Sequence, residues 1–156
     1  MRGRGHITVR RRVLVSALAL AASAGTSTRA WCDLPFKDIV DRVETVILVE
    51  YRKPRGETAS VVTLEVFKGE SRQGSADLDP EELEAYRPRN GAKYLIALTS
   101  FGRIARYIEG IGACSPVSVL PLRGQKLRAD DRFNYDGGHD PLTLDALRED
   151  LTRHLD

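Results

Sequence analysis

The fold class follows from the stretch TVILVEYR, residues 45–52, and from the residues on either side of it. Its β-branched and aromatic side chains favour a strand, and the nearly continuous apolar run predicts that this strand is largely buried. The residues KPRGE at 53–57 then supply the proline and glycine that are typical of a turn. A second run, residues 58–68, alternates apolar and polar side chains. Because the connecting turn is short, we expect the two strands to pair antiparallel.

Short helices and further strands are predicted along the next part of the chain. Residues 36–43 carry apolar side chains at helical spacing, and Asp79 followed by Pro80 predicts the start of a short helix. Residues 92–99 form the clearest core strand, and residues 103–109 are expected to pair back onto it as a hairpin. Weaker strand candidates are residues 73–79 and 117–122. We therefore expect a mainly β protein with short helices, arranged as a small barrel or sandwich.

The C-terminal part divides into a polar segment and a helix. Residues 126–140 are rich in Asp and Gly and predict a solvated loop. A calcium loop starting at Arg132 would lack a carboxylate at its first and twelfth positions, so we do not predict calcium binding. Residues 141–156 predict a helix that docks on the strands, with a free partner-binding helix as the alternative. Its apolar stripe consists of Leu144, Leu147, Leu151 and Leu155.

The first thirty residues have the three parts of a secretory signal peptide. Five arginines lie in residues 1–12, an apolar run of about ten residues follows, and Ala22-Ser23-Ala24 offers small residues for cleavage. We predict a signal peptide at residues 1–24, with a second possible cut after Ala30. An uncleaved anchor is the alternative, although a spanning helix needs roughly 20 apolar residues. The arginine run also resembles a twin-arginine signal, so either export route remains open.

The overall charge is misleading because the leader is basic. The 156-residue chain has a formal charge of +2, from 24 Lys and Arg against 22 Asp and Glu. Removing residues 1–24 removes five arginines and no acid, which changes the charge to −3, and a cut after Ala30 also removes Arg29 and gives −4. A mildly acidic domain does not favour nucleic acid as a partner. After cleavage we expect one exported domain with no stable membrane span.

The two cysteines, Cys32 and Cys114, both follow the predicted leader. In an oxidising compartment an even count suggests pairing, and two cysteines allow one bridge. Such a bridge closes a loop that the chain-entropy model values at roughly 4 kcal/mol. The alternative is a catalytic thiol in which Cys114 works with His139 or His154. No protease signature surrounds Cys114, and the cysteines and histidines lack zinc-site spacing, so we predict no catalytic, cofactor-binding or metal-binding residues.

Several features occur in a recognisable order along the chain. They are a signal peptide, a cysteine at the start of the mature chain, a strand ending in Glu65-Val66-Phe67-Lys68-Gly69, a strand introduced by Gly91-Ala92-Lys93-Tyr94-Leu95, and Cys114-Ser115. Together they resemble the TIMP-like or netrin-module-like OB-fold group, in particular its small bacterial exported members. The resemblance implies a five-stranded OB-like β-barrel over residues 31–125, with its N-terminus tied to the barrel by a disulfide.

The resemblance also implies metalloprotease inhibition of the TIMP-like type as an alternative function. In those inhibitors the first mature residue is a cysteine whose amine and carbonyl chelate the zinc of the protease. The corresponding residue here is Cys32. Trp31 precedes it, and Asp33 and Leu34 follow it, so the Cys-x-Cys opening of the family is absent.

From the sequence we therefore predict an exported, periplasmic or secreted, disulfide-stapled binding module that is not an enzyme and needs no cofactor. Its expected partner is a protein or a glycan of the cell envelope or outside the cell. The alternatives are the metalloprotease inhibitor and a thiol hydrolase that uses Cys114 and His139.

Overall fold

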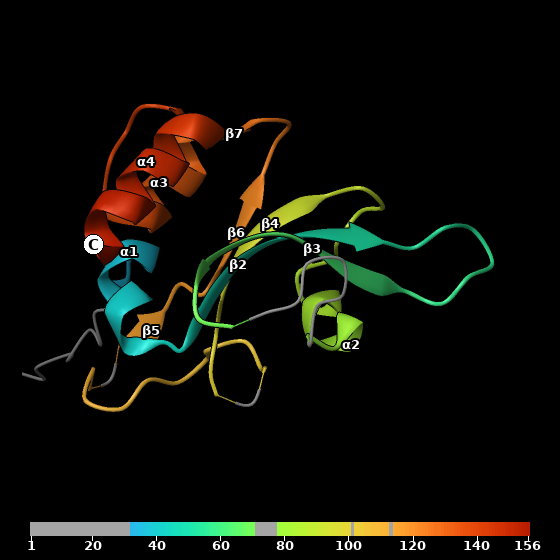
Figure 1. The fold of residues 1–156 in the computed structure, drawn as a ribbon, viewed down its shortest axis with the longest axis horizontal. Helices are drawn as coiled ribbons and strands as arrows, with labels where there is room; N and C mark the ends of the chain where they lie inside the picture. Colours follow the sequence, from blue (N-terminus) through green and yellow to red (C-terminus); the bar gives the residue numbers. More distant parts are fainter. Residues whose placement is uncertain (1–31, 71–77, 101, 113) are drawn as a thin grey trace, which may run out of the picture.

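The computed structural model describes residues 32–70, 78–100, 102–112 and 114–156 (Figure 1). The predicted signal peptide at residues 1–24, its cleavage sites, and most of the weak strand predicted at 73–79 lie outside the described residues. Within these residues, no helix combines the length and the hydropathy needed to cross a membrane.

Four antiparallel strands form the central sheet, in the order β3-β2-β4-β6. They are β2 (Thr45–Arg52), β3 (Ser60–Lys68), β4 (Lys93–Leu98) and β6 (Val119–Leu122). Each lies where a strand was predicted, and the β2–β3 hairpin is antiparallel as expected. The prediction of a mainly β chain with short helices is therefore confirmed.

The sheet is open, whereas the family resemblance implied a closed five-stranded barrel. In the described part of the chain, β3 and β6 are its two edges. The predicted hairpin partner of β4, residues 103–109, returns antiparallel to the end of β4 through one isolated bridge, Leu98 with Ile104, and forms no strand, so most of the predicted hairpin is absent. Ala97 shows why: its N–H donates to the Ser118 carbonyl at 2.9 Å, while its own carbonyl accepts from the Ala105 N–H at 3.0 Å. From Lys93 to Ile96 the place beside β4 belongs to β6, and the segment around Ile104 reaches β4 only beyond Ala97. The described strands do not confirm a barrel.

Two short helices lie where spacing and capping predicted them. α1 (Phe36–Ile39) continues into the 3-10 turn η1 (Val40–Arg42) and leads directly to β2. α2 (Pro80–Glu84) begins after Asp79, whose carboxylate accepts a 2.9 Å hydrogen bond from the Glu81 N–H. A side chain of this kind satisfies one of the free N–H groups of a first helical turn.

The C-terminal helix α4 (Leu144–Leu155) is present as predicted. It starts at Thr143, whose hydroxyl accepts a 3.3 Å hydrogen bond from the Ala146 N–H. The preceding strand β8 (Leu142–Thr143) pairs antiparallel with β7 (Lys126–Leu127). The helix docks through its leucine stripe, in which Leu144, Leu147 and Leu151 are buried and Leu155 packs at the margin of the core.

Residues 126–140 are not the polar loop that their composition predicted. Besides β7, they contain the helix α3 (Ala129–Asp136). Tyr135 of α3 is fully buried, and its ring lies 6.3 Å from the ring of Phe36 in α1. The helix has too few apolar residues to show a helical stripe in the sequence. Its stability comes instead from packing against other elements, as is usual for short helices.

Apolar side chains fill both faces of the sheet. One face packs against α1, α3 and α4, and the other packs against α2 and the chain around Ile104. Figure 1 shows α1, α3 and α4 grouped together and α2 apart from them. Burial on both faces explains the nearly continuous apolar runs of β2 and β4. Val46, Leu48, Leu95 and Ala97 belong to the first core, and Ile47, Val49, Tyr94, Ile96 and Leu98 belong to the second.

Candidate functional site

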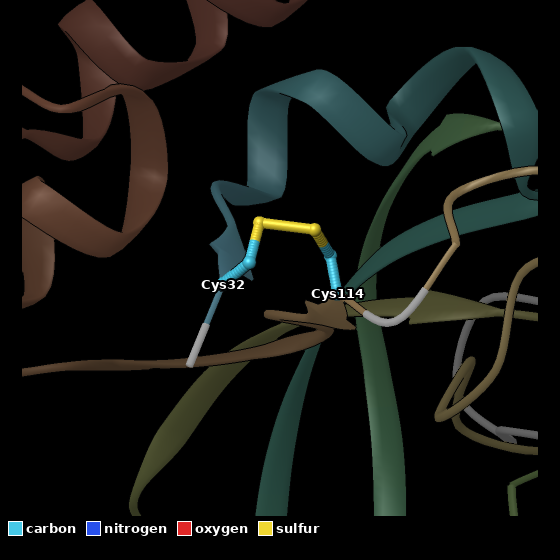
Figure 2. Close-up of a disulfide and its surroundings, with 2 residues drawn as sticks. All are labelled: Cys32 and Cys114. Carbon is cyan, nitrogen blue, oxygen red and sulfur yellow. A yellow bond between two sulfur atoms is a disulfide. The ribbon is translucent and has the colours of Figure 1, made fainter. Parts of the chain in front are cut away.

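Figure 2 shows the disulfide that joins Cys32 and Cys114. Their Cα atoms lie 4.5 Å apart. The bond spans 82 positions of the sequence and confirms the predicted pairing. Beside it, β1 (Asp33–Leu34) pairs in parallel with β5 (Ser115–Pro116). The Ser115 N–H donates to the Cys32 carbonyl at 2.8 Å. The disulfide therefore fastens the segment before α1 to the segment before β6.

The disulfide leaves the thiol-hydrolase alternative without a nucleophile. Both cysteine sulfurs are used in the bond, and a thiol nucleophile must be free to ionise. His139 stacks on Phe133 of α3, with ring centroids 6.0 Å apart. His154 lies with its Nε2 atom 3.5 Å from Asp41 Oδ2. The predicted cysteine pair is brought together, and Cys114 therefore has no free thiol for a histidine to activate.

A cleft of about 510 Å³ opens on the second face of the sheet, between the α2–β4 connection and the end of β6. We call it the basic cleft. Its walls carry three arginines, and among the described residues no acidic side chain lines it. Its floor is formed by apolar side chains of β4 and β6. The wall arginines are Arg87, Arg89 and Arg123, and the floor residues are Tyr94, Val119 and Pro121.

Hydrogen bonds to β2 hold the first wall, residues 85–92, in place. The Gly91 N–H donates to the Tyr51 carbonyl at 2.8 Å, and Asn90 Oδ1 accepts from the Lys53 N–H at 2.8 Å. Gly91 has φ 77°, a left-handed conformation that glycine adopts at low cost. Because the wall is hydrogen-bonded to Tyr51 of β2 and to Lys53 immediately after that strand, its arginine side chains extend from a well-fixed backbone.

Glu84 fixes the start of the same wall. Its Oε1 atom accepts hydrogen bonds from Lys53 Nζ at 2.9 Å and from the Tyr51 hydroxyl at 2.7 Å. These two hydrogen bonds, that of Lys53 first, lower the pKa of Glu84 and keep it ionised. Arg87 follows with φ 50°, and its N–H donates to the Glu84 carbonyl at 3.0 Å. A left-handed arginine costs roughly 1–2 kcal/mol, and the anchoring of the wall sustains that strain.

The second wall is the turn that joins β6 to β7. The Arg123 N–H donates to the Lys126 carbonyl at 2.9 Å, and Gly124 has φ 66°. The antiparallel register of β4 and β6 places Tyr94 opposite Pro121. This pairing, and not proximity in the sequence, brings the turn beside the arginines of the first wall.

The cleft arginines form no close ion pair. Within the described chain, Arg87, Arg89 and Arg123 have no carboxylate within salt-bridge distance, whereas arginines such as Arg52, Arg132, Arg148 and Arg153 pair with carboxylates at 2.7 to 2.8 Å. Burial raises the pKa of Tyr94, and the backbone hydrogen bond of Arg89 and the charges of Arg123 and Arg89 partly offset that rise, so both arginines act on one hydroxyl of the floor. Burial also raises the pKa of Asp131, and the positive charge of Arg123 partly offsets that rise. The cleft is therefore a locally positive site with an apolar floor.

Sequence reasoning assigned no binding role to these residues. Residues 88–91 have the proline, asparagine and glycine typical of a turn, and the acidic net charge expected after removal of the leader pointed away from anionic partners. Two short arginine-containing segments, RPRN at 87–90 and LRGQ at 122–125, were the available signal. They lie far apart in the sequence, so nothing local indicated that they share a surface.

Two further hollows lie elsewhere on the protein. One of about 380 Å³ has walls of mixed charge that include Arg42, Glu44 and Glu109. Another, of about 360 Å³, is mostly acidic and contains Glu57 and Glu81. Over the described residues, no three His, Cys, Asp or Glu side chains lie close enough together to hold a metal ion. Neither hollow combines charge of one sign with an apolar floor as the basic cleft does.

Comparison with known proteins adds no family to this picture. No protein-family model, no curated protein and no solved structure matches the chain. The resemblance to the TIMP-like or netrin-module-like group therefore stays a prediction, and the candidate site rests on the geometry of the chain itself.

Proposed function

We propose that this chain is an exported, disulfide-stapled binding module that acts without catalysis. The observation that carries the proposal is the Cys32–Cys114 disulfide, because such bonds form and persist in oxidising compartments. The signal peptide predicted at residues 1–24 points to the same compartments, the periplasm or the medium. The staple also suits a small domain, whose core alone supplies limited stability.

The basic cleft is the surface that supports a binding role. Its arginines are exposed, its first wall is bonded to the sheet, and its floor belongs to the core. Concave sites of this size with a few polar groups over an apolar base are typical of ligand and partner recognition. The partner class expected from the sequence was a protein or a glycan.

Intact-mass spectrometry of the protein recovered from the exporting cell tests the proposal. We expect a chain that lacks residues 1–24 or 1–30, that gains two hydrogens on reduction, and that takes up alkylating reagent only after reduction. A full-length cytoplasmic chain with two free thiols would contradict it. A Cys114→Ala variant is the matched control, because it should take up reagent at Cys32 without reduction.

The same measurement bears on the metalloprotease-inhibitor alternative. That mechanism requires a mature chain that begins at Cys32, so that its amine is free to chelate zinc. A chain beginning at Trp31, or earlier, would remove the chemical basis of the alternative.

A further inference from the structure

We propose that the basic cleft binds an acidic segment of a protein partner, in which carboxylate side chains lie next to apolar ones. The proposal rests on the binding role proposed above and specifies the chemistry of the partner. The features that point to it are the three unpaired arginines of the walls and the apolar floor between them.

Charge complementarity is the first argument. Arg87, Arg89 and Arg123 are all exposed and form no ion pair in the described chain. A guanidinium group presents a planar set of donors that matches a carboxylate with two parallel hydrogen bonds. Without the predicted leader the chain carries a net negative charge, so the cleft is a local exception that steers acidic groups to one place.

The floor supplies the second argument. Tyr94 and Val119 are nearly buried, and Pro121 beside them is partly exposed. At the rim, Tyr86 keeps 43% of its surface exposed. Tyrosine and arginine are enriched at the energetic centres of protein interfaces. An apolar side chain of the partner would cover this floor while neighbouring carboxylates meet the arginines.

The hydrogen-bonding groups of the cleft favour a peptide over a glycan. Sugar hydroxyls need acceptors as well as donors, and arginine has no acceptor. The side-chain acceptors of the lining are Asn90 Oδ1, which already accepts from the Lys53 N–H, and the hydroxyls of Tyr86 and Tyr94, so charged donors outnumber free acceptors. A nucleic acid is disfavoured because its many phosphates would meet the acidic remainder of the surface.

Fluorescence anisotropy with the mature, disulfide-bonded protein tests the proposal. The probe is a labelled octapeptide of alternating Glu and Val, and the comparison peptides replace Glu with Gln or with Lys. We expect a dissociation constant tighter than ~1 mM for the Glu peptide, weakening as salt is added, and no measurable binding of the other two. Equal binding of the Gln peptide would overturn the charge argument.

Variants locate the binding. Arg89→Gln and Arg123→Gln should each weaken binding of the Glu peptide about tenfold, because each removes a charged donor pair. Arg55→Gln, an exposed arginine in the β2–β3 turn, is the matched control and should change binding by less than about twofold. Arg89→Glu should weaken binding of the Glu peptide more than Arg89→Gln does, because it adds a repelling charge to the cleft. Unchanged circular dichroism and unfolding midpoints establish that each variant is folded.

The remaining outcomes overturn the proposal in distinguishable ways. No binding of the Glu peptide, or binding that the cleft variants leave intact, rejects the site. Stronger binding of oligogalacturonate or of a single-stranded oligonucleotide rejects the partner class. Salt-sensitive self-association that Arg89→Gln abolishes would assign the cleft to a second copy of the chain. Peptide binding with free thiols in the exported protein would reject the disulfide-stapled role and leave the cleft intact.

Discussion

The hydroxyl of Tyr135 donates a 2.8 Å hydrogen bond to Oδ2 of Asp150 and thereby joins α3 to α4. Lys37 of α1 donates from Nζ to both oxygens of the same carboxylate, at 2.9 and 3.0 Å. One partly buried carboxylate therefore connects the three helices that cover one face of the sheet. Tyr135 lies in residues 126–140, a segment whose composition did not predict a helix.

Replacing Tyr135 with Phe should lower the free energy of unfolding by about 1–2 kcal/mol, because a buried hydrogen bond to a charged acceptor is lost while the ring remains. Urea denaturation measures the change. Tyr107→Phe is the control, since Tyr107 is 75% exposed, and it should shift stability by less than about 0.5 kcal/mol. Equal effects of the two substitutions would show that the Tyr135–Asp150 bond contributes nothing.

Acid should weaken the same junction. Burial raises the pKa of Asp150, but the hydrogen bonds from Lys37 and Tyr135 outweigh it and hold the pKa below its usual value of 3.8. The folded state then binds fewer protons than the unfolded state, so the stabilisation is complete above that value and is lost as the pH falls through the lower folded pKa. Asp150→Asn should flatten stability against pH below about pH 4. Asp140→Asn, at an exposed carboxylate, should keep the wild-type slope in the same denaturation series.

Removing the disulfide with Cys32→Ala and Cys114→Ala together should cost about 2–4 kcal/mol, because the unfolded chain regains the entropy of a long loop. Guanidinium denaturation with and without reductant provides the measurement. Reductant should bring the wild-type midpoint down to that of the double variant and leave the double variant unchanged. A wild-type midpoint insensitive to reductant, with reduction verified by mass, would contradict the expected stabilisation.

Docking of α4 depends on its inward leucines. Leu151 is fully buried, so Leu151→Ala should destabilise the protein by about 2–4 kcal/mol through lost contacts and the cavity left behind. Leu155 packs at the margin of the core, and Leu155→Ala should cost clearly less. Thermal unfolding of the two variants side by side makes the comparison, and a larger loss at Leu155 would be inconsistent with the observed docking.

Gly69 follows the end of β3, and Gly56 lies in the turn before that strand, so the two glycines can be compared. Both have positive φ, 79° and 83°, so an alanine at either site pays roughly 1–2 kcal/mol for the left-handed backbone. A Cβ at Gly69 would also collide with the Glu44 carbonyl, whereas Gly56 has no atom within 4 Å of that position. Gly69→Ala should therefore be more destabilising than Gly56→Ala in urea denaturation. Similar losses of stability would indicate that the backbone at Glu44, just before β2, moves to make room for the added methyl group.

Local patterns carried the predictions that the structure confirmed. Burial of β2 and β4 on both faces left long apolar runs, and the leucine spacing of α4 reflects a single buried stripe. The Asp79 cap and the disulfide pairing followed from residue chemistry and from the presence of just two cysteines. In each case the pattern that supported the prediction lies within one helix or strand, or in the number of cysteines.

Competition and long-range packing account for the predictions that failed. Residues 103–109 have strand-forming side chains, yet β6 takes the place beside β4 that a hairpin would have filled. The segment containing α3 is polar apart from residues such as Tyr135, whose burial depends on Phe36 about a hundred positions away. No local sequence pattern predicts that β6 lies beside β4 or that α3 forms.

The order of residues was enough to specify strands, caps, the C-terminal helix and the covalent link, because periodicity and side-chain chemistry act over a few positions. Tertiary structure decided that the sheet stays open and that α3 forms. It also created the basic cleft, because the register of β4 against β6 brings Arg123 beside the wall that carries Arg87 and Arg89. The physical reason is that pairing and packing energies depend on which distant segments meet, and the side chains of one segment do not encode that choice alone.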